Sequence, residues 1–180
     1  MTPIMRQTNK NNMKIGITGG RGRMGRVLLQ ELVKRQDLSL GGVSVRGNGP
    51  PIAIEEHSPI IPTTDPEVLF QHSDIIVDFT TPQATQTHVQ LAQKLKKPIV
   101  ICTTGFDGSL QRSISHLART VPVMVAPNTS LGIAVLAQLT QTAALMLGPD
   151  FDVEIIDIHH RHKKDAPSGT AKYLQRHLSA

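Results

Sequence analysis

Aromatic residues are nearly absent from this chain of 180 residues, which has no Trp, one Tyr and four Phe. Its core must therefore be built from Val, Ile, Leu, Ala and Met. Proteins that bind single-stranded nucleic acid stack the bases on aromatic side chains. The shortage of aromatic residues therefore argues against a nucleic-acid partner.

Cysteine and long apolar runs are scarce too. Cys102 is the only cysteine, which excludes an intramolecular disulfide and a metal cage built from cysteines. A single thiol fits a reducing compartment, so we expect a cytoplasmic protein. The chain has no run of eighteen apolar residues, so we expect no membrane span. Residues 1–12 lack the apolar stretch of a signal peptide, and we interpret them as a disordered leader.

The charge balance is basic. The formal net charge is +5 and the isoelectric point is about 9.7. A basic chain suits anionic partners, which include nucleic acid, cofactor phosphates and carboxylate substrates. Because aromatic residues are few, small anionic ligands are the preferred hypothesis.

Apolar strand patterns alternate with helical patterns along most of the chain, which predicts an α/β fold with a doubly wound parallel sheet. Residues 46–66 are rich in Pro, Gly and polar residues and are expected to be mostly loop. The expected strands are Met13–Thr18, Leu38–Val45, Asp74–Phe79, Pro98–Cys102, Val121–Ala126 and Val153–Ile158. The first expected helix follows the glycine-rich turn and ends at about Arg35. Further helices are expected over Gln83–Leu95, Leu110–Arg119 and Leu131–Leu147, and a last one begins at about Gly169.

A glycine-rich turn follows the first expected strand. Gly20–Gly25 matches the pattern G-x-G-x-x-G, and Gly19, Gly22 and Gly25 also give G-x-x-G-x-x-G. Such glycines allow a tight turn and a close approach of the backbone to a pyrophosphate, which the next helix binds at its N-terminus. The alternative is a βα turn without a ligand. The position between a strand and a helix favours dinucleotide binding.

The end of the second expected strand bears on the choice of cofactor. Sites that prefer NAD usually carry an acidic residue there, about 20 residues after the glycines. Residues 42–47 contain no carboxylate, and Arg46 stands where a 2′-phosphate would lie. Arg46 could equally be an exposed loop residue. We prefer NADPH, with NADH as the second choice.

The segment 154–171 reads EIIDIHHRHKKDAPSGTA and concentrates histidine and basic residues at the end of an expected strand. A metal site using His159, His160 and His162 lacks the HExxH spacing, and no helix is expected there, so no metal is expected. A solvated basic loop is a second interpretation. A site for a carboxylate substrate, with one histidine as general acid, is favoured. Ser168–Thr170 supports it, because hydroxyls and backbone N–H groups at a helix start suit a carboxylate.

This segment resembles the signature of the 4-hydroxy-tetrahydrodipicolinate reductase family, formerly called dihydrodipicolinate reductases. The likeness extends in order over further blocks from about Met13 to the C-terminus. These blocks are the GRMG of the glycine loop, Asp78–Thr80, Thr103–Phe106, and Ala126–Asn128 continuing through Ser130 and Gly132.

The resemblance implies a dinucleotide-binding domain over residues 13–130 and the beginning of a second α/β, substrate-binding domain over 131–180. It implies reduction of a cyclic dicarboxylate with NADPH or NADH on the route to diaminopimelate and lysine, by a homotetramer. His159 would donate the proton, Lys163 would be the second catalytic residue, and His160, Ser168, Gly169 and Thr170 would hold the substrate. The implied cofactor contacts are Gly19, Gly20, Arg21, Gly22, Arg23, Met24, Gly25, Arg46, Phe79, Thr80, Cys102, Thr103, Thr104, Ala126, Pro127, Asn128 and Thr129.

Several positions differ from the family pattern. Arg21 replaces a small residue, Cys102 stands where glycine is usual, Thr129 where an aromatic residue is common, and Asp157 replaces a glutamate. The family also continues with further strands beyond the position of Ala180. We therefore expect residues 1–180 to bind cofactor better than they catalyse, with a doubtful tetramer. The alternative function is a non-catalytic cofactor-binding relic or fragment.

Overall fold

The computed structural model describes residues 12–55, 57–126, 128–161 and 166–178. The chain divides into two compact units, Met1–Val125 and Ala126–Ala180, and each is described by itself. None of the described helices is long and apolar enough to span a bilayer.

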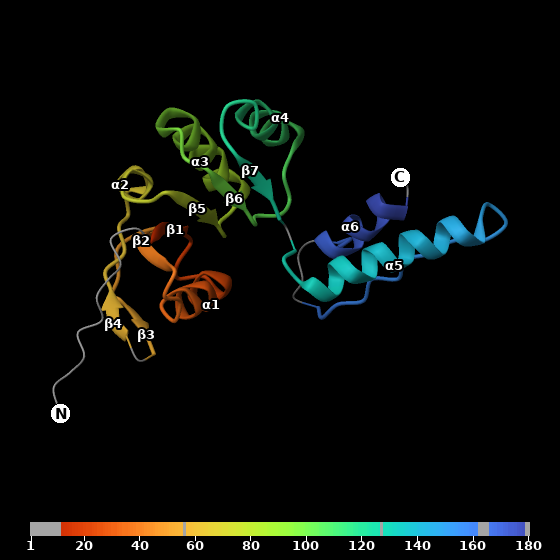
Figure 1. The fold of residues 1–180 in the computed structure, drawn as a ribbon, viewed down its shortest axis with the longest axis horizontal. Helices are drawn as coiled ribbons and strands as arrows, with labels where there is room; N and C mark the ends of the chain where they lie inside the picture. Colours follow the sequence, from red (N-terminus) through yellow and green to blue (C-terminus); the bar gives the residue numbers. More distant parts are fainter. Residues whose placement is uncertain (1–11, 56, 127, 162–165, 179–180) are drawn as a thin grey trace. The chain divides into compact units, whose positions relative to one another are not determined.

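A parallel sheet of five strands forms the centre of the first unit (Figure 1). Every strand pair is parallel, which confirms the predicted α/β fold. The chain adds β2 on one side of β1 and then continues with β5 on the other, so the strand order reverses at β1. The order across the sheet is β2 (Leu38–Ser44), β1 (Met13–Thr18), β5 (Ile75–Asp78), β6 (Ile99–Ile101) and β7 (Val123–Val125).

Helices cover both faces of this sheet (Figure 1). Alternating residues of β5 separate the two cores: Ile76 packs in one cluster, whereas Ile75 and Val77 pack against the other. The first cluster includes Phe70 and Leu117, and the second is built around residues of β1 and the following helix. The helices are α1 (Arg23–Leu32), α2 (Pro66–Gln71), α3 (Pro82–Leu95) and α4 (Gly108–Leu117).

The N-termini of three of these helices have side-chain caps. Asp65 accepts a hydrogen bond from the Glu67 N–H at 2.8 Å, and Asp107 accepts one from the Leu110 N–H at 2.8 Å. Thr81 caps α3 in the same way. Such caps satisfy amide groups that have no partner within the helix. The start of α1 differs, because its N-cap residue is a glycine.

The expectation of loop over residues 46–66 is only partly correct. An antiparallel pair, β3 (Ile52–Ile54) and β4 (His57–Ile60), lies within this range. Ile52 and Ile54 are both buried and join the core on the α1 side. Three residues that alternate between buried and exposed positions are too short a pattern to predict a strand within a segment rich in Pro and Gly.

The second unit consists of α5 (Leu131–Leu147) and α6 (Gly169–Leu178), which pack together, and the segment between them. The predicted strand Val153–Ile158 is wrong, because residues 152–160 have no regular secondary structure. A strand requires a neighbour to satisfy its backbone groups, and none of the described residues after Val125 forms one.

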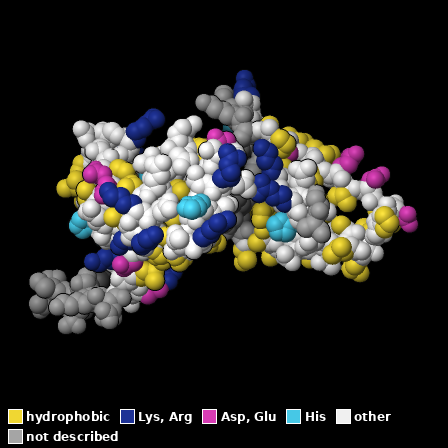
Figure 2. Space-filling view, turned by 90° about the horizontal axis from the view of Figure 1, so that it is seen from above, with side chains coloured by type: hydrophobic (Ala, Val, Ile, Leu, Met, Phe, Trp, Pro, Cys, Tyr) yellow, Lys and Arg dark blue, Asp and Glu magenta, His cyan; other side chains and the backbone are white. Residues whose placement is uncertain are grey.

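Many apolar side chains of the second unit are exposed. Leu145 is 75% exposed, Ile156 81% and Ile158 86%. Figure 2 shows hydrophobic side chains in yellow at the surface of this unit. The apolar residues that suggested a strand therefore form no core among the described residues.

Phe70 on α2 tests the assignment of the first core. Its side chain is 0% exposed, so Phe70→Ala should leave a cavity and lower the free energy of unfolding by about 3–5 kcal/mol. Val68 is 42% exposed on the same helix, and Val68→Ala should cost less than about 0.5 kcal/mol. Chemical denaturation followed by circular dichroism measures both. A loss below about 1 kcal/mol for Phe70→Ala would contradict the assignment.

Candidate functional site

The carboxyl ends of the five parallel strands form one aligned edge. The register pairs Thr18 with Ser44 on one side and with Asp78 on the other, and Asp78 with Ile101. The predicted cofactor residues of the first unit follow these strand ends directly. Ligands of open α/β sheets bind at this edge, where the strand order reverses.

The glycine loop connects β1 to α1 at that reversal. Gly19 adopts φ +77°, a conformation that favours glycine, and a Cβ there would lie 2.6 Å from the Phe79 carbonyl oxygen. A Cβ on Gly25 would lie 2.4 Å from the Gly19 carbonyl oxygen, and one on Gly20 would lie 2.1 Å from Val43 Cγ1. These positions leave no room for a side chain, as expected for a backbone that must pack closely.

Hydrogen bonds within the loop limit which amides can reach an anion. Gly19 and Gly20 N–H both donate to the Ser44 carbonyl, at 3.0 and 3.3 Å, and Gly22 N–H donates to the Gly19 carbonyl at 2.9 Å. The first turn of α1 has neither a capping side chain nor an acidic residue. Its N–H groups, starting at Arg23, are therefore the amides suited to bind a phosphate.

Two arginines border the loop. Arg21 Nη2 donates to the Pro50 carbonyl at 2.7 Å, and the guanidinium lies within 2.8 Å of the position of a Cβ on Gly49. The Arg21 side chain therefore extends towards residues 49–50. Arg46 is exposed and comes two residues after Ser44, whose carbonyl binds the glycine loop. Arg46 thus occupies the β2 side of the loop.

A buried carboxylate lies at the end of β5. Asp78 is 0% exposed, and five donors surround it. Its Oδ1 accepts from Thr18 Oγ1 at 2.8 Å, from Thr80 N at 3.0 Å and from Thr80 Oγ1 at 2.6 Å. Its Oδ2 accepts from Thr85 Oγ1 at 2.8 Å and from His88 Nδ1 at 3.1 Å. These bonds connect β1, the loop after β5, and α3.

The surroundings of Asp78 keep it ionised. Burial alone would raise the pKa of Asp78, but the hydrogen bond and charge of His88, together with the hydroxyls of Thr80 and Thr85, hold that pKa below its ordinary value. No role for Asp78, Thr85 or His88 was predicted from the sequence. The spacing of Thr85 and His88, three residues apart on one helix face, was the available signal.

The loop after β6 carries the remaining cofactor candidates of the first unit. Cys102 N–H donates to the Asp78 carbonyl at 2.9 Å, Thr103 is buried and Thr104 is exposed. Burial, followed by the charge of Asp78, raises the pKa of the Cys102 thiol to about 11. The thiol therefore stays protonated at neutral pH and is unsuited to nucleophilic chemistry.

In the second unit, Asp157 binds both the candidate acid and the start of α6. Asp157 Oδ1 lies 2.6 Å from His159 Nε2 and accepts from Ser168 Oγ at 3.1 Å, and Oδ2 accepts from Ser168 N at 2.7 Å. The backbone N–H of Ser168 is the main cause that lowers the Asp157 pKa. An ionised carboxylate in this position orients the imidazole. This role of Asp157 was not predicted from the sequence, where Asp157 stood out only because it replaces the family's glutamate.

Both polar hydrogens of Ser168 are thus committed to Asp157, and its Oγ also accepts from Ala171 N–H at 3.0 Å. Ser168 therefore acts here as the cap of α6. Asn128 Nδ2 donates to Thr170 Oγ1 at 3.0 Å, which brings together one predicted cofactor residue and one predicted substrate residue. Pro127 and Lys163 lie outside the described residues.

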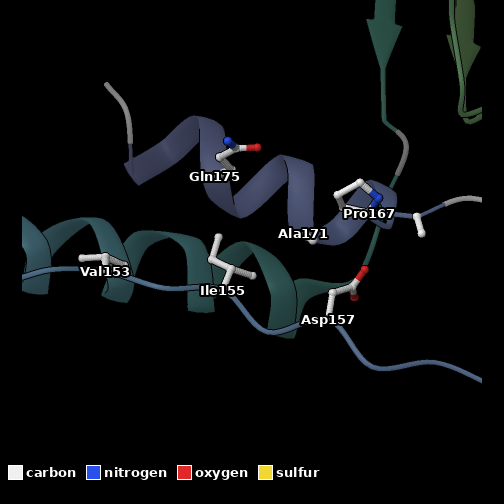
Figure 3. Close-up of a pocket in the computed structure, with 7 residues that line it drawn as sticks. Val153, Ile155, Asp157, Pro167, Ala171 and Gln175 are labelled. Carbon is white, nitrogen blue, oxygen red and sulfur yellow. The ribbon is translucent and has the colours of Figure 1, made fainter.

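A cavity of about 590 Å³ lies between the segment 153–157 and α6. In Figure 3, the Asp157 carboxylate points towards Pro167, ahead of α6. His159 is not among the lining residues. These are Val153, Ile155, Asp157, Ala166, Pro167, Ala171 and Gln175.

The strand order, the glycine loop and the aligned sheet edge define the first unit as a Rossmann-type α/β domain. The chain belongs to the dihydrodipicolinate reductase family, which confirms the resemblance found in the sequence. The family model for the dihydrodipicolinate reductase N-terminus matches residues 13–129, and the model for its C-terminus matches residues 132–180.

Individual relatives agree. The chain is 42% identical over 170 residues to 4-hydroxy-tetrahydrodipicolinate reductase of Zymomonas mobilis, covering 94% of this chain and 63% of that protein. It is 39% identical over 162 residues to the reductase of Helicobacter hepaticus, covering 90% and 62%. A solved structure of dipicolinate-bound dihydrodipicolinate reductase from Paenisporosarcina sp. TG-14 is 27% identical, with a TM-score of 0.73, covering 93% and 66%. The chain thus spans less than two thirds of the length of these relatives.

The lowered pKa of Asp78 predicts how stability depends on pH. The pKa of Asp78 is lower in the folded protein than in the unfolded chain, where it is near 3.8. The ionised carboxylate therefore contributes its full stability above about pH 3.8. That contribution is lost as the pH falls through the pKa of the folded state. Asp78→Asn should cost about 3 kcal/mol of unfolding free energy at pH 7. The difference from the parent should shrink below about pH 4.

Denaturant titrations of both proteins at a series of pH values measure this difference. Asp37→Asn is the control, because it removes an exposed ion pair with Arg35 and should change little at pH 7. A parent-to-variant difference that stayed constant down to pH 2.5 would show that the Asp78 carboxylate does not supply the stability.

Proposed function

We propose that this chain supplies the cofactor-binding domain and the acid-bearing segment of a 4-hydroxy-tetrahydrodipicolinate reductase. The reaction is reduction of 4-hydroxy-tetrahydrodipicolinate to tetrahydrodipicolinate, with NADPH preferred over NADH. The observation that carries the proposal is the glycine loop, which lies where the strand order reverses and has no room for side chains at Gly19 and Gly25.

The residues at the sheet edge fit a dinucleotide. The first turn of α1 offers unpaired amides to the pyrophosphate, and Arg46 stands on the β2 side, where the adenosine half would lie. The loops after β5 and β6 then border the other half. When bound, the nicotinamide would supply a hydride to the substrate.

Hydride addition to a conjugated imine needs a proton from a nearby acid, and His159 is the candidate. Asp157 would fix the orientation of its ring through the contact at Nε2. That contact leaves Nδ1 as the nitrogen that can face a substrate. His160, Gly169 and Thr170 remain candidates for binding the substrate carboxylates, and Lys163 the candidate for a second catalytic residue.

A second candidate function is a cofactor-binding protein without turnover. The observation that favours it is the segment Val153–Ile158, which has no strand partner among the described residues of its unit. Both functions predict NADPH binding, whereas only the first predicts consumption of NADPH with the cyclic substrate. The cytoplasmic location expected from the sequence remains part of this proposal. The homotetramer implied by the family belongs to the complete reductase and is not proposed for residues 1–180 alone.

Arg46→Ala tests the preference for NADPH. If Arg46 contacts the 2′-phosphate, the loss of a charge-assisted contact worth about 1.5–3 kcal/mol should weaken NADPH binding by roughly ten- to a hundredfold. Binding of NADH should stay within about twofold. Fluorescence titration with both cofactors measures the effect, and Arg119→Ala, an exposed arginine after α4, is the control. Equal losses for both cofactors would refute the assignment.

His159→Gln tests the catalytic assignment. In the chain assayed for NADPH oxidation with the cyclic substrate, the variant should lower kcat by roughly 10²–10⁴-fold, because a positioned proton donor is lost. NADPH affinity should not change. His116→Gln, on the exposed side of α4, provides the control. A kcat within about threefold of the parent would exclude His159 as the acid, and NADPH binding without turnover by the parent would favour the second candidate function.

A further inference from the structure

We propose that Asp78 is a positioning residue that makes Thr80 a hydrogen-bond acceptor at the cofactor edge. In this arrangement Thr80 contacts a hydroxyl or amide donor of the dinucleotide and no phosphate. The inference rests on the proposed function, because it assumes that the edge binds a dinucleotide. The observation behind it is that both polar hydrogens of Thr80 are directed at one buried carboxylate.

Thr80 lies beside the glycine loop. A Cβ on Gly19 would lie 3.1 Å from Thr80 Cγ2, so the Thr80 methyl packs against the start of the loop. By position alone, Thr80 would be a natural ligand for the pyrophosphate, since threonine hydroxyls commonly donate to phosphate. Donation to a phosphate requires a free hydrogen, however, and Thr80 has none to offer.

Asp78 takes both polar hydrogens of Thr80. An ionised carboxylate only accepts hydrogen bonds, so Thr80 N–H and Thr80 Oγ–H must both donate to Asp78. The 2.6 Å separation of Thr80 Oγ1 and Asp78 Oδ1 is typical of a strong, charge-assisted O–H···O⁻ bond. Asp78 is fully buried, so water does not compete for it. The half-buried Thr80 oxygen therefore presents only lone pairs.

Asp78 also orients a hydroxyl in the loop after β6. Thr85 Oγ1 lies 2.8 Å from Asp78 Oδ2 and 2.9 Å from Thr103 Oγ1. The single Thr85 hydroxyl hydrogen is taken by the carboxylate, so Thr103 must donate to Thr85. Asp78 thus fixes the hydroxyl hydrogens of Thr80 directly and of Thr103 through Thr85.

The edge is consequently polarised along the sheet. The side near β2 and α1 offers donors, namely the free amides of the first turn and the Arg46 guanidinium. The side near β5 offers acceptor oxygen at Thr80. A dinucleotide has matching groups, because its phosphates only accept, whereas its nicotinamide ribose and carboxamide carry hydrogens to donate. In the placement proposed above, the nicotinamide half lies over β5 and β6, so its ribose and carboxamide hydrogens are the donors that can reach the Thr80 oxygen.

Thr80→Val and Thr80→Ser test this inference. Valine keeps the shape but removes the acceptor, whereas serine keeps the acceptor and the bond to Asp78. We expect Thr80→Val to weaken NADPH binding by roughly three- to tenfold, the effect of one neutral hydrogen bond. Binding of 2′,5′-ADP, which lacks the nicotinamide half, should stay within about twofold. Thr80→Ser should bind NADPH within about twofold of the parent.

The comparison of the two ligands separates positioning from simple destabilisation. A distorted glycine loop would weaken both ligands equally, and that outcome would overturn the inference. So would unchanged NADPH binding by Thr80→Val. Thr120→Val, a threonine after α4 with its hydroxyl on the Leu117 carbonyl, controls for the substitution itself. A parent protein that binds neither NADPH nor 2′,5′-ADP would refute the proposed function. If only the Thr80 inference fails, the parent still binds both ligands.

Discussion

The burial of the Asp78 carboxylate is the interaction on which the cofactor edge depends. Removing a charge from water is costly unless donors replace the lost hydration. Here the donors come from β1, the loop after β5, and α3, so each of these segments must be in place for the charge to be tolerated. The same bonds that satisfy Asp78 therefore set the relative positions of the glycine loop and the loops beside it.

A similar arrangement recurs in the second unit at smaller scale. Asp157 accepts from both polar hydrogens of Ser168 and contacts His159, so one carboxylate connects the candidate acid to the start of α6. In both units a carboxylate determines which neighbouring groups still have hydrogens to offer. Residue type alone therefore does not decide whether a threonine or serine at the site donates or accepts.

The sequence predicted the features that depend on local pattern. The glycine loop and the strand end Thr18 follow from runs of adjacent residues, and so they were found. The strand predicted over Asp74–Phe79 was found as β5, which covers Ile75–Asp78. The Asp78 cluster was not, because it depends on the register between β1 and β5 and on the face of α3 that carries His88. The strand predicted at Val153–Ile158 failed for a related reason, since an apolar run becomes a strand only when another strand lies beside it.

The contact between the glycine loop and β2 also constrains how this family can vary. A Cβ on Gly20 would lie 2.1 Å from Val43 Cγ1, so alanine at position 20 and valine at position 43 cannot both fit unless the Val43 side chain or a strand end moves. A smaller residue at position 43 would remove the clash. The two positions are 23 residues apart in the chain but should change together during evolution, with alanine at 20 accompanied by alanine or glycine at 43.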